Sequence, residues 1–157
     1  MFSKFKKLFG PPRPILTLED RDFGAIRYDP PNNMTNYGCW QMDDKWGDTT
    51  LSSASIPGDE SGPFERERRF MLEKFNSTDE LWDLCSSDLF LASELLIKEV
   101  TKDNLREIFF ITCINTNLMD SEDFEWEVCF ESKDDYRWLY VGLQIVSGQV
   151  VSNTIDT

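Results

Sequence analysis

The stretch Phe124-Glu125-Trp126-Glu127-Val128-Cys129-Phe130-Glu131 decides the fold class. Every second residue is large and apolar, and three of the four residues between them are glutamates. A period of two is typical of a strand with one buried face, here opposed by an anionic face. Residues 136–146 predict a second strand and residues 149–155 a third, joined by the two-residue turn Ser147-Gly148. The C-terminal third is therefore predicted to be an antiparallel meander.

Upstream of the meander, residues 108–114 are apolar on both faces, as expected for a central strand that helices cover on one side. The middle of the chain is predicted to be helical. One helix is expected to begin with Pro63 at its first position. Ser77-Thr78-Asp79-Glu80 predicts a capping box that starts a second helix. Ser86-Ser87-Asp88 is expected to interrupt or recap that helix before residues 90–100.

The N-terminal part is predicted to be β structure. Residues 15–28 form a hairpin pattern that turns at Asp20-Arg21-Asp22, and residues 39–42 and 49–56 follow as two more strands. Residues 57–62 are expected to close this region. The order predicts one α+β domain over residues 15–157: an antiparallel sheet with N-terminal hairpins, two or three central helices packed on it, and a C-terminal β meander.

Residues 1–14 are a basic amphipathic segment followed by a proline-rich linker. Phe2, Phe5 and Phe9 fall on one helical face, so an alternative function is a membrane-surface adaptor that acts through residues 2–9. The acidic remainder of the chain is repelled by the negative charge of an anionic membrane, so membrane contact is not expected. The segment lacks the apolar run of a secretion signal.

Charge is the strongest functional indication. The 157 residues include 29 acids, 16 Lys and Arg and no histidine, for a formal charge of −13. Such a surface repels nucleic acid and attracts basic proteins. Arg66, Arg68 and Arg69 are the densest basic cluster outside the first segment, and the interleaved glutamates predict ion pairs on a helix surface. The composition favours a protein that binds over one that catalyses.

Catalytic patterns are sparse. A serine or cysteine nucleophile usually needs a histidine base, and neither glycine-rich phosphate loops nor a nucleophile elbow occur. Cys39, Cys85, Cys113 and Cys129 show no CxxC spacing, which predicts buried free thiols in a reducing cytoplasm and no bound cofactor.

Two acidic clusters leave an enzyme hypothesis open. Asp43, Asp44 and Asp48 form one cluster, and Asp120, Glu122 and Asp123 form the other. Either set is a candidate for a carboxylate-based, metal-dependent hydrolase, but clusters arise by chance in a chain this acidic, and a solvated acidic loop is the plainer interpretation of both.

The aromatic residues have two interpretations. Trp40, Trp126, Trp138 and Tyr140 are expected in the core rather than around a ligand. Trp46 differs, because it lies between acids in a predicted loop and is a candidate interface anchor.

The segment Asp22-Phe23-Gly24-Ala25-Ile26-Arg27-Tyr28, followed by Trp40 and Trp46-Gly47, resembles the opening of small bacterial domains found among polymorphic-toxin immunity loci. Residues 136–146, YRWLYVGLQIV, are similar to the terminal aromatic hairpin of those domains. One departure is Gly142-Leu143, where a Gly-His step is expected. The resemblance implies a cytoplasmic immunity protein that binds and blocks a basic cognate toxin.

The acidic loops are then the expected toxin-binding surface, and the oligomeric state stays open. The predicted partner-binding residues are Asp43, Asp44, Trp46, Asp48, Asp59, Glu60, Asp120, Glu122 and Asp123.

Overall fold

The computed structural model describes residues 15–32, 35–42 and 51–157. The described strands are β1 (Thr17–Asp20), β2 (Gly24–Asp29), β3 (Gly38–Met42), β4 (Ser53–Asp59), β5 (Gly62–Pro63), β6 (Phe109–Thr116), β7 (Glu125–Ser132), β8 (Tyr140–Val146) and β9 (Gln149–Asp156). The described helices are α1 (Glu65–Asn76), α2 (Thr78–Ser93) and α3 (Leu105–Ile108). The predicted α+β class is confirmed.

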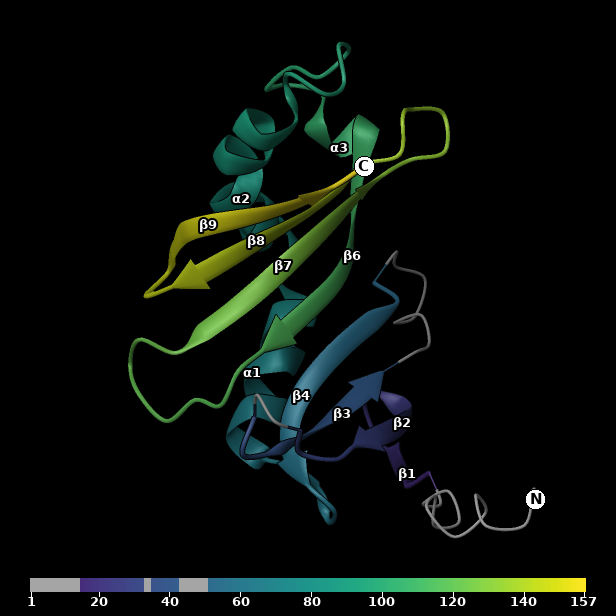
Figure 1. Cartoon of the computed structure of the whole chain (residues 1–157), viewed down its shortest axis with the longest axis vertical. Helices are drawn as coiled ribbons and strands as arrows, with labels where there is room; N and C mark the ends of the chain where they lie inside the picture. Colours follow the sequence, from purple (N-terminus) through teal and green to yellow (C-terminus); the bar gives the residue numbers. More distant parts are fainter. Residues whose placement is uncertain (1–14, 33–34, 43–50) are drawn as a thin grey trace, which may run out of the picture.

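All of these strands belong to one sheet in the order β1-β2-β3-β4-β6-β7-β8-β9, and β5 pairs with the end of β4. Neighbours are antiparallel except β4 and β6, which are parallel over Ser53–Ser55 and Cys113–Asn115. This short parallel contact joins an N-terminal antiparallel half to the C-terminal meander (Figure 1). The predicted meander and the central position of the strand after the helices are both confirmed.

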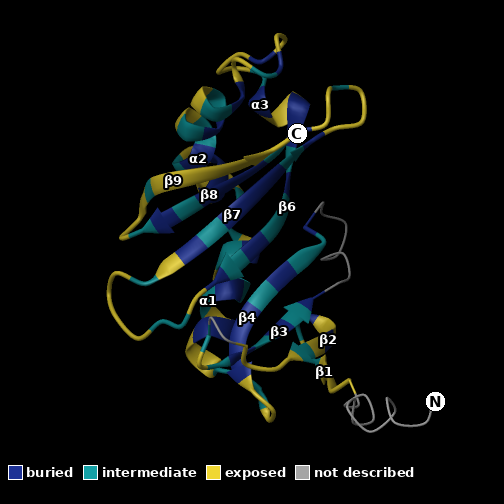
Figure 2. Ribbon diagram, viewed as in Figure 1, coloured by how far each residue is buried: buried dark blue, intermediate teal, exposed yellow. Residues whose placement is uncertain are grey.

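The helices lie on one face of the sheet (Figure 1). Helix α1 packs against β4 and β6, whereas α2 packs against β8 and β9. The strand residues that point to the helices are buried and mostly apolar, as period-two alternation requires. They include Ile56 on β4, Val128 and Phe130 on β7 and Leu143 on β8. Figure 2 shows the outermost strand, β9, almost wholly exposed.

The opposite face of the sheet carries no described helix, and we call it the open face. Its side chains alternate with the buried set and are mainly polar, so they form hydrogen bonds from strand to strand. Gln41 Nε2 donates to Ser55 Oγ at 3.1 Å, and Ser152 Oγ donates to Gln144 Oε1 at 2.8 Å.

The two predicted turns form as expected. Asp20 lies at the β1–β2 turn, where its carboxylate accepts from the N–H groups of Asp22 and Phe23. Ser147 and Gly148 connect β8 to β9 with φ angles of 49° and 73°. Positive φ at both residues is the type I′ geometry that matches the twist of paired strands.

The prediction that residues 57–62 end the N-terminal strands was wrong. Strand β4 continues through Pro57 and Gly58 to Asp59 and turns back as β5, with Gly58 opposite Pro63. Pro63 is therefore a strand residue, and α1 begins later, at Glu65. Proline is tolerated at the edge of a sheet, because its missing N–H is not needed there for a hydrogen bond between strands. Pro63 can therefore lie in a strand, and the helix starts later than predicted.

Helix α2 begins after Ser77 as predicted, but the Ser77 side chain makes no capping hydrogen bond. The predicted interruption at Ser86-Ser87-Asp88 is wrong, because Ser86 Oγ donates to the Trp82 carbonyl one turn back and leaves the helix intact. The helix instead ends at Ser93, so residues 90–100 are not one helix.

Three further expectations need correction. Trp40 and Trp126 are buried as predicted, but the Trp138 side chain lies on the surface, 47% exposed. Tyr140 is only half-buried, on the open face. Strand β8 starts at Tyr140 and not at residue 136, because residues 133–136 form a turn closed by the Tyr136 N–H on the Lys133 carbonyl.

The four cysteines are free, as predicted; Cys85 and Cys129 are buried, and Cys39 and Cys113 partly buried. Among the described residues, no helix is long and apolar enough to cross a membrane.

Candidate acidic groove

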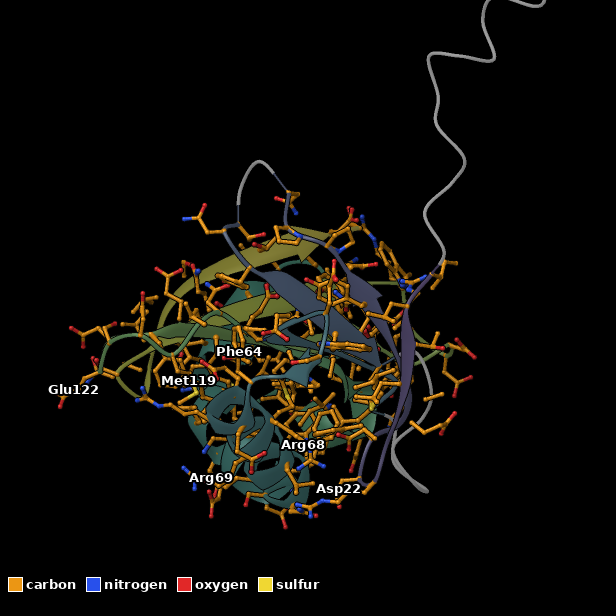
Figure 3. The ribbon with its side chains drawn as sticks, turned by 90° about the horizontal axis from the view of Figure 1, so that it is seen from below. Asp22, Phe64, Arg68, Arg69, Met119 and Glu122 are labelled. Atoms are coloured by element: carbon orange, nitrogen blue, oxygen red, sulfur yellow. The ribbon has the colours of Figure 1, made fainter. Side chains whose placement is uncertain are left out.

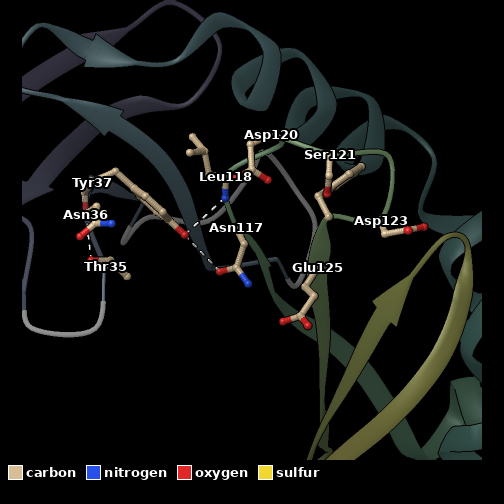
Figure 4. Close-up of a pocket in the computed structure, with 10 residues that line it drawn as sticks. Thr35, Asn36, Tyr37, Asn117, Leu118, Asp120, Ser121, Asp123 and Glu125 are labelled. Carbon is tan, nitrogen blue, oxygen red and sulfur yellow. Dashed lines mark hydrogen bonds between the residues drawn. The ribbon is translucent and has the colours of Figure 1, made fainter.

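A cavity of about 450 Å³ opens between the segment before β3 and the loop that joins β6 to β7. Figure 4 shows Tyr37 reaching from the first segment toward Asn117 and Leu118 in the loop. The lining residues are Thr35, Asn36, Tyr37, Asn117, Leu118, Asp120, Ser121, Asp123, Phe124 and Glu125.

Hydrogen bonds fix the two walls relative to each other. The Tyr37 hydroxyl donates to Asn117 Oδ1 at 3.5 Å and accepts from the Leu118 N–H at 3.3 Å. Thr35 Oγ1 donates to the Tyr37 carbonyl at 3.0 Å. At the base of the loop, the Asn117 N–H donates to the Glu125 carbonyl and continues the β6–β7 ladder.

Helix α1 holds the loop from the other side. The buried Glu67 carboxylate accepts from the Met119 N–H at 2.8 Å, and Arg66 donates to the Met119 carbonyl. The loop is therefore tied at its base by the bond between Asn117 and Glu125 and near its start at Leu118 and Met119, which favours a preformed wall there.

A second cavity of about 190 Å³ shares Asn117 and Glu125 with the first and continues onto the open face. Its other lining residues are Asn115, Trp126, Glu127 and Gln144. Amide groups orient its acids: Asn115 Nδ2 donates to Glu127 Oε2, and Gln144 Nε2 donates to Glu125 Oε2, both at 3.0 Å. We call the two adjoining cavities the acidic groove.

Among the residues that the structure describes, four carboxylates and neither lysine nor arginine line the acidic groove. The carboxylates belong to Asp120, Asp123, Glu125 and Glu127. Two aromatic rings, those of Tyr37 and Phe124, flank the carboxylates in the larger cavity. Such a site is suited to a cationic side chain, since the acids attract its charge and the rings pack against its alkyl chain.

The structure brings only some of the predicted site residues together. Asp120 and Asp123 line the groove. Glu122 belongs to the same loop but does not line it, and its exposed side chain lies at the outer edge of the molecule in Figure 3. Asp59 and Glu60 are exposed at the β4–β5 turn, outside the groove. Asp43, Asp44, Trp46 and Asp48 lie outside the described residues.

Asp59 is engaged within its own turn. Its carboxylate accepts a hydrogen bond from the side-chain hydroxyl of Ser61 and another from the Ser61 N–H, and these bonds lower the pKa of Asp59. The Asp59 carbonyl also accepts from Trp40 Nε1 at 2.9 Å, so Asp59 helps to hold the end of β4.

The acids of the loop do not converge on a single point. Within residues 15–32, 35–42 and 51–157, no three cysteine, aspartate or glutamate side chains are grouped closely enough to hold a metal ion. Asp120, Glu122 and Asp123 therefore do not form the cluster that the hydrolase hypothesis requires.

The predicted ion pairs on the surface of the first helix are also wrong. Arg68 is buried and pairs with Asp20 and Asp22, far away in sequence, as Figure 3 shows for Arg68 and Asp22. Glu67 is buried too and holds the loop at Met119. Arg68 thus serves tertiary packing, whereas Arg66 and Arg69 are exposed.

The sequence analysis did not predict the residues that complete the groove. Glu125 and Glu127 carried a usable signal, because alternation along residues 124–131 already placed them on an anionic face. Tyr37 and Asn117 carried none, since they are 80 residues apart and meet only through the fold. Comparisons of the chain with protein-family models, curated proteins and solved structures found no match.

Proposed function

We propose that this chain is a cytoplasmic immunity protein that binds and neutralises a cognate toxin domain through the acidic groove. The observation that carries the proposal is the set of four carboxylates in two adjoining cavities, which no lysine or arginine within residues 15–32, 35–42 and 51–157 lines. The net charge of −13 and the sequence resemblance to immunity-locus domains support it.

The physical basis is charge complementarity. Toxin domains that cleave polyanions carry basic clefts, and an acidic partner is steered to such a cleft by long-range attraction. A lysine or arginine of the toxin would enter the groove between Asp120 and Glu125 and pack along Tyr37. The loop is already tied to α1 by Glu67, so binding requires little ordering of the site.

The same proposal includes the other predicted contacts. The exposed Asp59 and Glu60 are proposed as contacts outside the groove. The sequence adds Asp43, Asp44, Trp46 and Asp48 as proposed contacts. The partner is a basic protein and not a nucleic acid, because phosphates are repelled by the same carboxylates.

The test is co-expression of the chain with the toxin domain encoded beside it. Growth should be rescued, and the purified pair should form a complex that weakens as salt is raised. The groove variant combines Asp120→Asn, Asp123→Asn and Glu125→Gln. The matched control combines Glu94→Gln, Glu99→Gln and Asp103→Asn, which removes the same charge from exposed residues elsewhere.

The groove variant should slow association by about tenfold or more at low salt and abolish rescue, whereas the control should change the rate by only about twofold. Equal losses in both variants would mean that net charge alone sets the association rate, which would contradict toxin binding at the groove. A neighbouring toxin that the chain neither binds nor blocks would contradict the proposed function itself.

A further inference from the structure

Two cysteines face each other on the open face of the sheet. Cys113 on β6 pairs with Cys129 on β7 in the antiparallel register. The Asn117 N–H donates to the Glu125 carbonyl four residues along the same ladder, so Cys113 and Cys129 are also a hydrogen-bonded pair. The Cα atoms of such a pair are about 5.5 Å apart. Disulfides span about 4.4–6.8 Å between Cα atoms, so this Cα spacing permits a bond once the Cβ atoms, about 5.5 Å apart in such a pair, approach each other by about 1 Å.

The two thiols interact and differ in exposure. Each thiol shifts the pKa of the other, and both bond the same side chain: Cys113 Sγ donates to Asn115 Oδ1 at 3.1 Å, and Asn115 Nδ2 donates to Cys129 Sγ at 4.0 Å. Cys129 is fully buried, whereas Cys113 is partly exposed. A reagent in solution therefore meets Cys113 first.

The interaction between the two thiols also shifts their pKa values in opposite directions. Donation from Cys129 lowers the pKa of Cys113 and outweighs the opposing effect of its burial. The same bond, together with burial, raises the pKa of Cys129. The thiolate, which is the nucleophile in disulfide exchange, thus forms on the accessible member of the pair.

The other two cysteines lack this arrangement. Cys85 is completely buried, and its burial raises its pKa to about 12. Cys39 lies opposite Pro57 on the neighbouring strand, and burial raises its pKa as well. They serve as internal controls in the same molecule.

We propose that Cys113 and Cys129 form a redox-active thiol pair, a site at which a small-molecule disulfide such as oxidised glutathione generates a cross-strand disulfide. The Cys113 thiolate attacks one glutathione sulfur, which forms a mixed disulfide and releases one glutathione thiolate. Cys129 then loses its proton and attacks the Cys113 sulfur, which releases the second glutathione. The protein loses two electrons and two protons, and one oxidised glutathione becomes two reduced molecules.

This inference is independent of toxin binding. It rests on the register of β6 and β7 and on the shared partner Asn115, and it requires none of the groove carboxylates of Asp120, Asp123 and Glu125.

The experiment treats the folded chain with graded ratios of oxidised to reduced glutathione, then alkylates the remaining thiols in urea and digests with trypsin. No lysine or arginine lies between Cys113 and Cys129, so residues 107–133 form one peptide that contains both. Cys39 and Cys85 fall in other peptides. The expected product is a 107–133 peptide that lacks the mass of two hydrogens and carries no alkyl group, at ratios where Cys39 and Cys85 are still fully alkylated.

Two variants resolve the order of attack. Cys129→Ser should accumulate a glutathione adduct on Cys113, because the resolving thiol is missing. Cys113→Ser should form about tenfold less adduct on Cys129, because that thiol is buried. A chain unfolded in urea should lose the preference for Cys113.

The wild-type peptide map decides the matter even if a variant fails to fold. Alkylation of both Cys113 and Cys129 at every glutathione ratio would overturn the proposal. Adducts that appear on Cys39 or Cys85 as readily as on Cys113 would overturn it as well.

Discussion

The guanidinium of Arg68 on α1 forms a two-point ion pair with the carboxylate of Asp20 at the β1–β2 turn. Nε donates to Oδ2, and a terminal nitrogen donates to Oδ1, both at 2.7 Å. The two side chains are only 9% and 7% exposed. Asp22 supplies a second carboxylate, and the Phe23 ring lies 5.6 Å from the guanidinium carbon. This contact fastens the first hairpin to the helix layer.

Replacement of Arg68 by methionine should destabilise the fold strongly. The change leaves Asp20 buried without its cation, and loss of one partner of a buried pair costs about 3 kcal/mol. Arg69→Met is the matched control, because Arg69 is the exposed neighbour on the same helix and its loss should cost within about 0.5 kcal/mol. Urea unfolding measures both. Equal destabilisation by the two variants would show that the buried ion pair contributes nothing particular.

The same pair predicts sensitivity to acid. Burial tends to raise the pKa of Asp20, but hydrogen bonds from Arg68 and from the N–H groups of Asp22 and Phe23 outweigh it and lower the pKa from 3.8 to about 2. Because the folded-state pKa is the lower one, the ionised carboxylate stabilises the fold above about pH 4. That contribution disappears as the pH falls from about 4 to 2.

Its size is about 1.5 kcal/mol after allowance for solvent screening at a turn. Wild type and Asp20→Asn should therefore differ most in unfolding free energy near pH 6, and the difference should shrink as the pH approaches 2. Urea titrations at several pH values measure it. A difference that is constant with pH would contradict the assigned pKa.

Local patterns predicted the parts of this fold that depend on neighbouring residues. The alternation of residues 124–131 predicted β7, and Ser147-Gly148 predicted the last hairpin turn, because both signals are complete within a few residues. Arg68 shows the limit of such reasoning. Its nearest acids in sequence are Glu65 and Glu67, yet its partner Asp20 is 48 residues away and is chosen by the packing of α1 on the sheet.

The candidate site was predictable to a similar degree. The density of acids singled out Asp120 and Asp123, which do line the groove. It also singled out Glu122, which points away, because the density of charge along a loop does not determine the direction of each side chain. The opposite wall, Tyr37, is supplied by a segment on the far side of the sheet's parallel junction.

Two glycines in strands should respond differently to alanine. A Cβ at Gly58 would clash with the backbone oxygen of Gly62 and lie 2.7 Å from the Trp40 ring. The backbone of Gly62 cannot move away without opening the β4–β5 turn. Gly58→Ala should therefore lower the free energy of unfolding by about 3 kcal/mol. A Cβ at Gly142 meets mainly the carboxylate end of Glu127, a side chain that can rotate away.

Gly142→Ala should accordingly cost only about 1 kcal/mol. Thermal and urea unfolding of the two variants give the comparison, and both positions are buried in strands, which matches them as a pair. If Gly142→Ala were as damaging as Gly58→Ala, Glu127 would be held far more rigidly by Asn115 than one hydrogen bond at 3.0 Å implies.

Tyr37→Phe should loosen one point in the loop that lines the groove. The change removes the acceptor of the Leu118 N–H, which donates to the Tyr37 hydroxyl at 3.3 Å. Loss of one such bond, worth about 1 kcal/mol, should accelerate hydrogen exchange at Leu118 about fivefold. The Asn117 amide, which donates to the Glu125 carbonyl, should exchange at its wild-type rate and serves as an internal reference. Thr35→Ala is the matched control, because it removes a neighbouring hydrogen bond and leaves the Tyr37 hydroxyl in place. Unchanged exchange at Leu118 would mean that α1, through Glu67 and Met119, holds the loop without help from Tyr37.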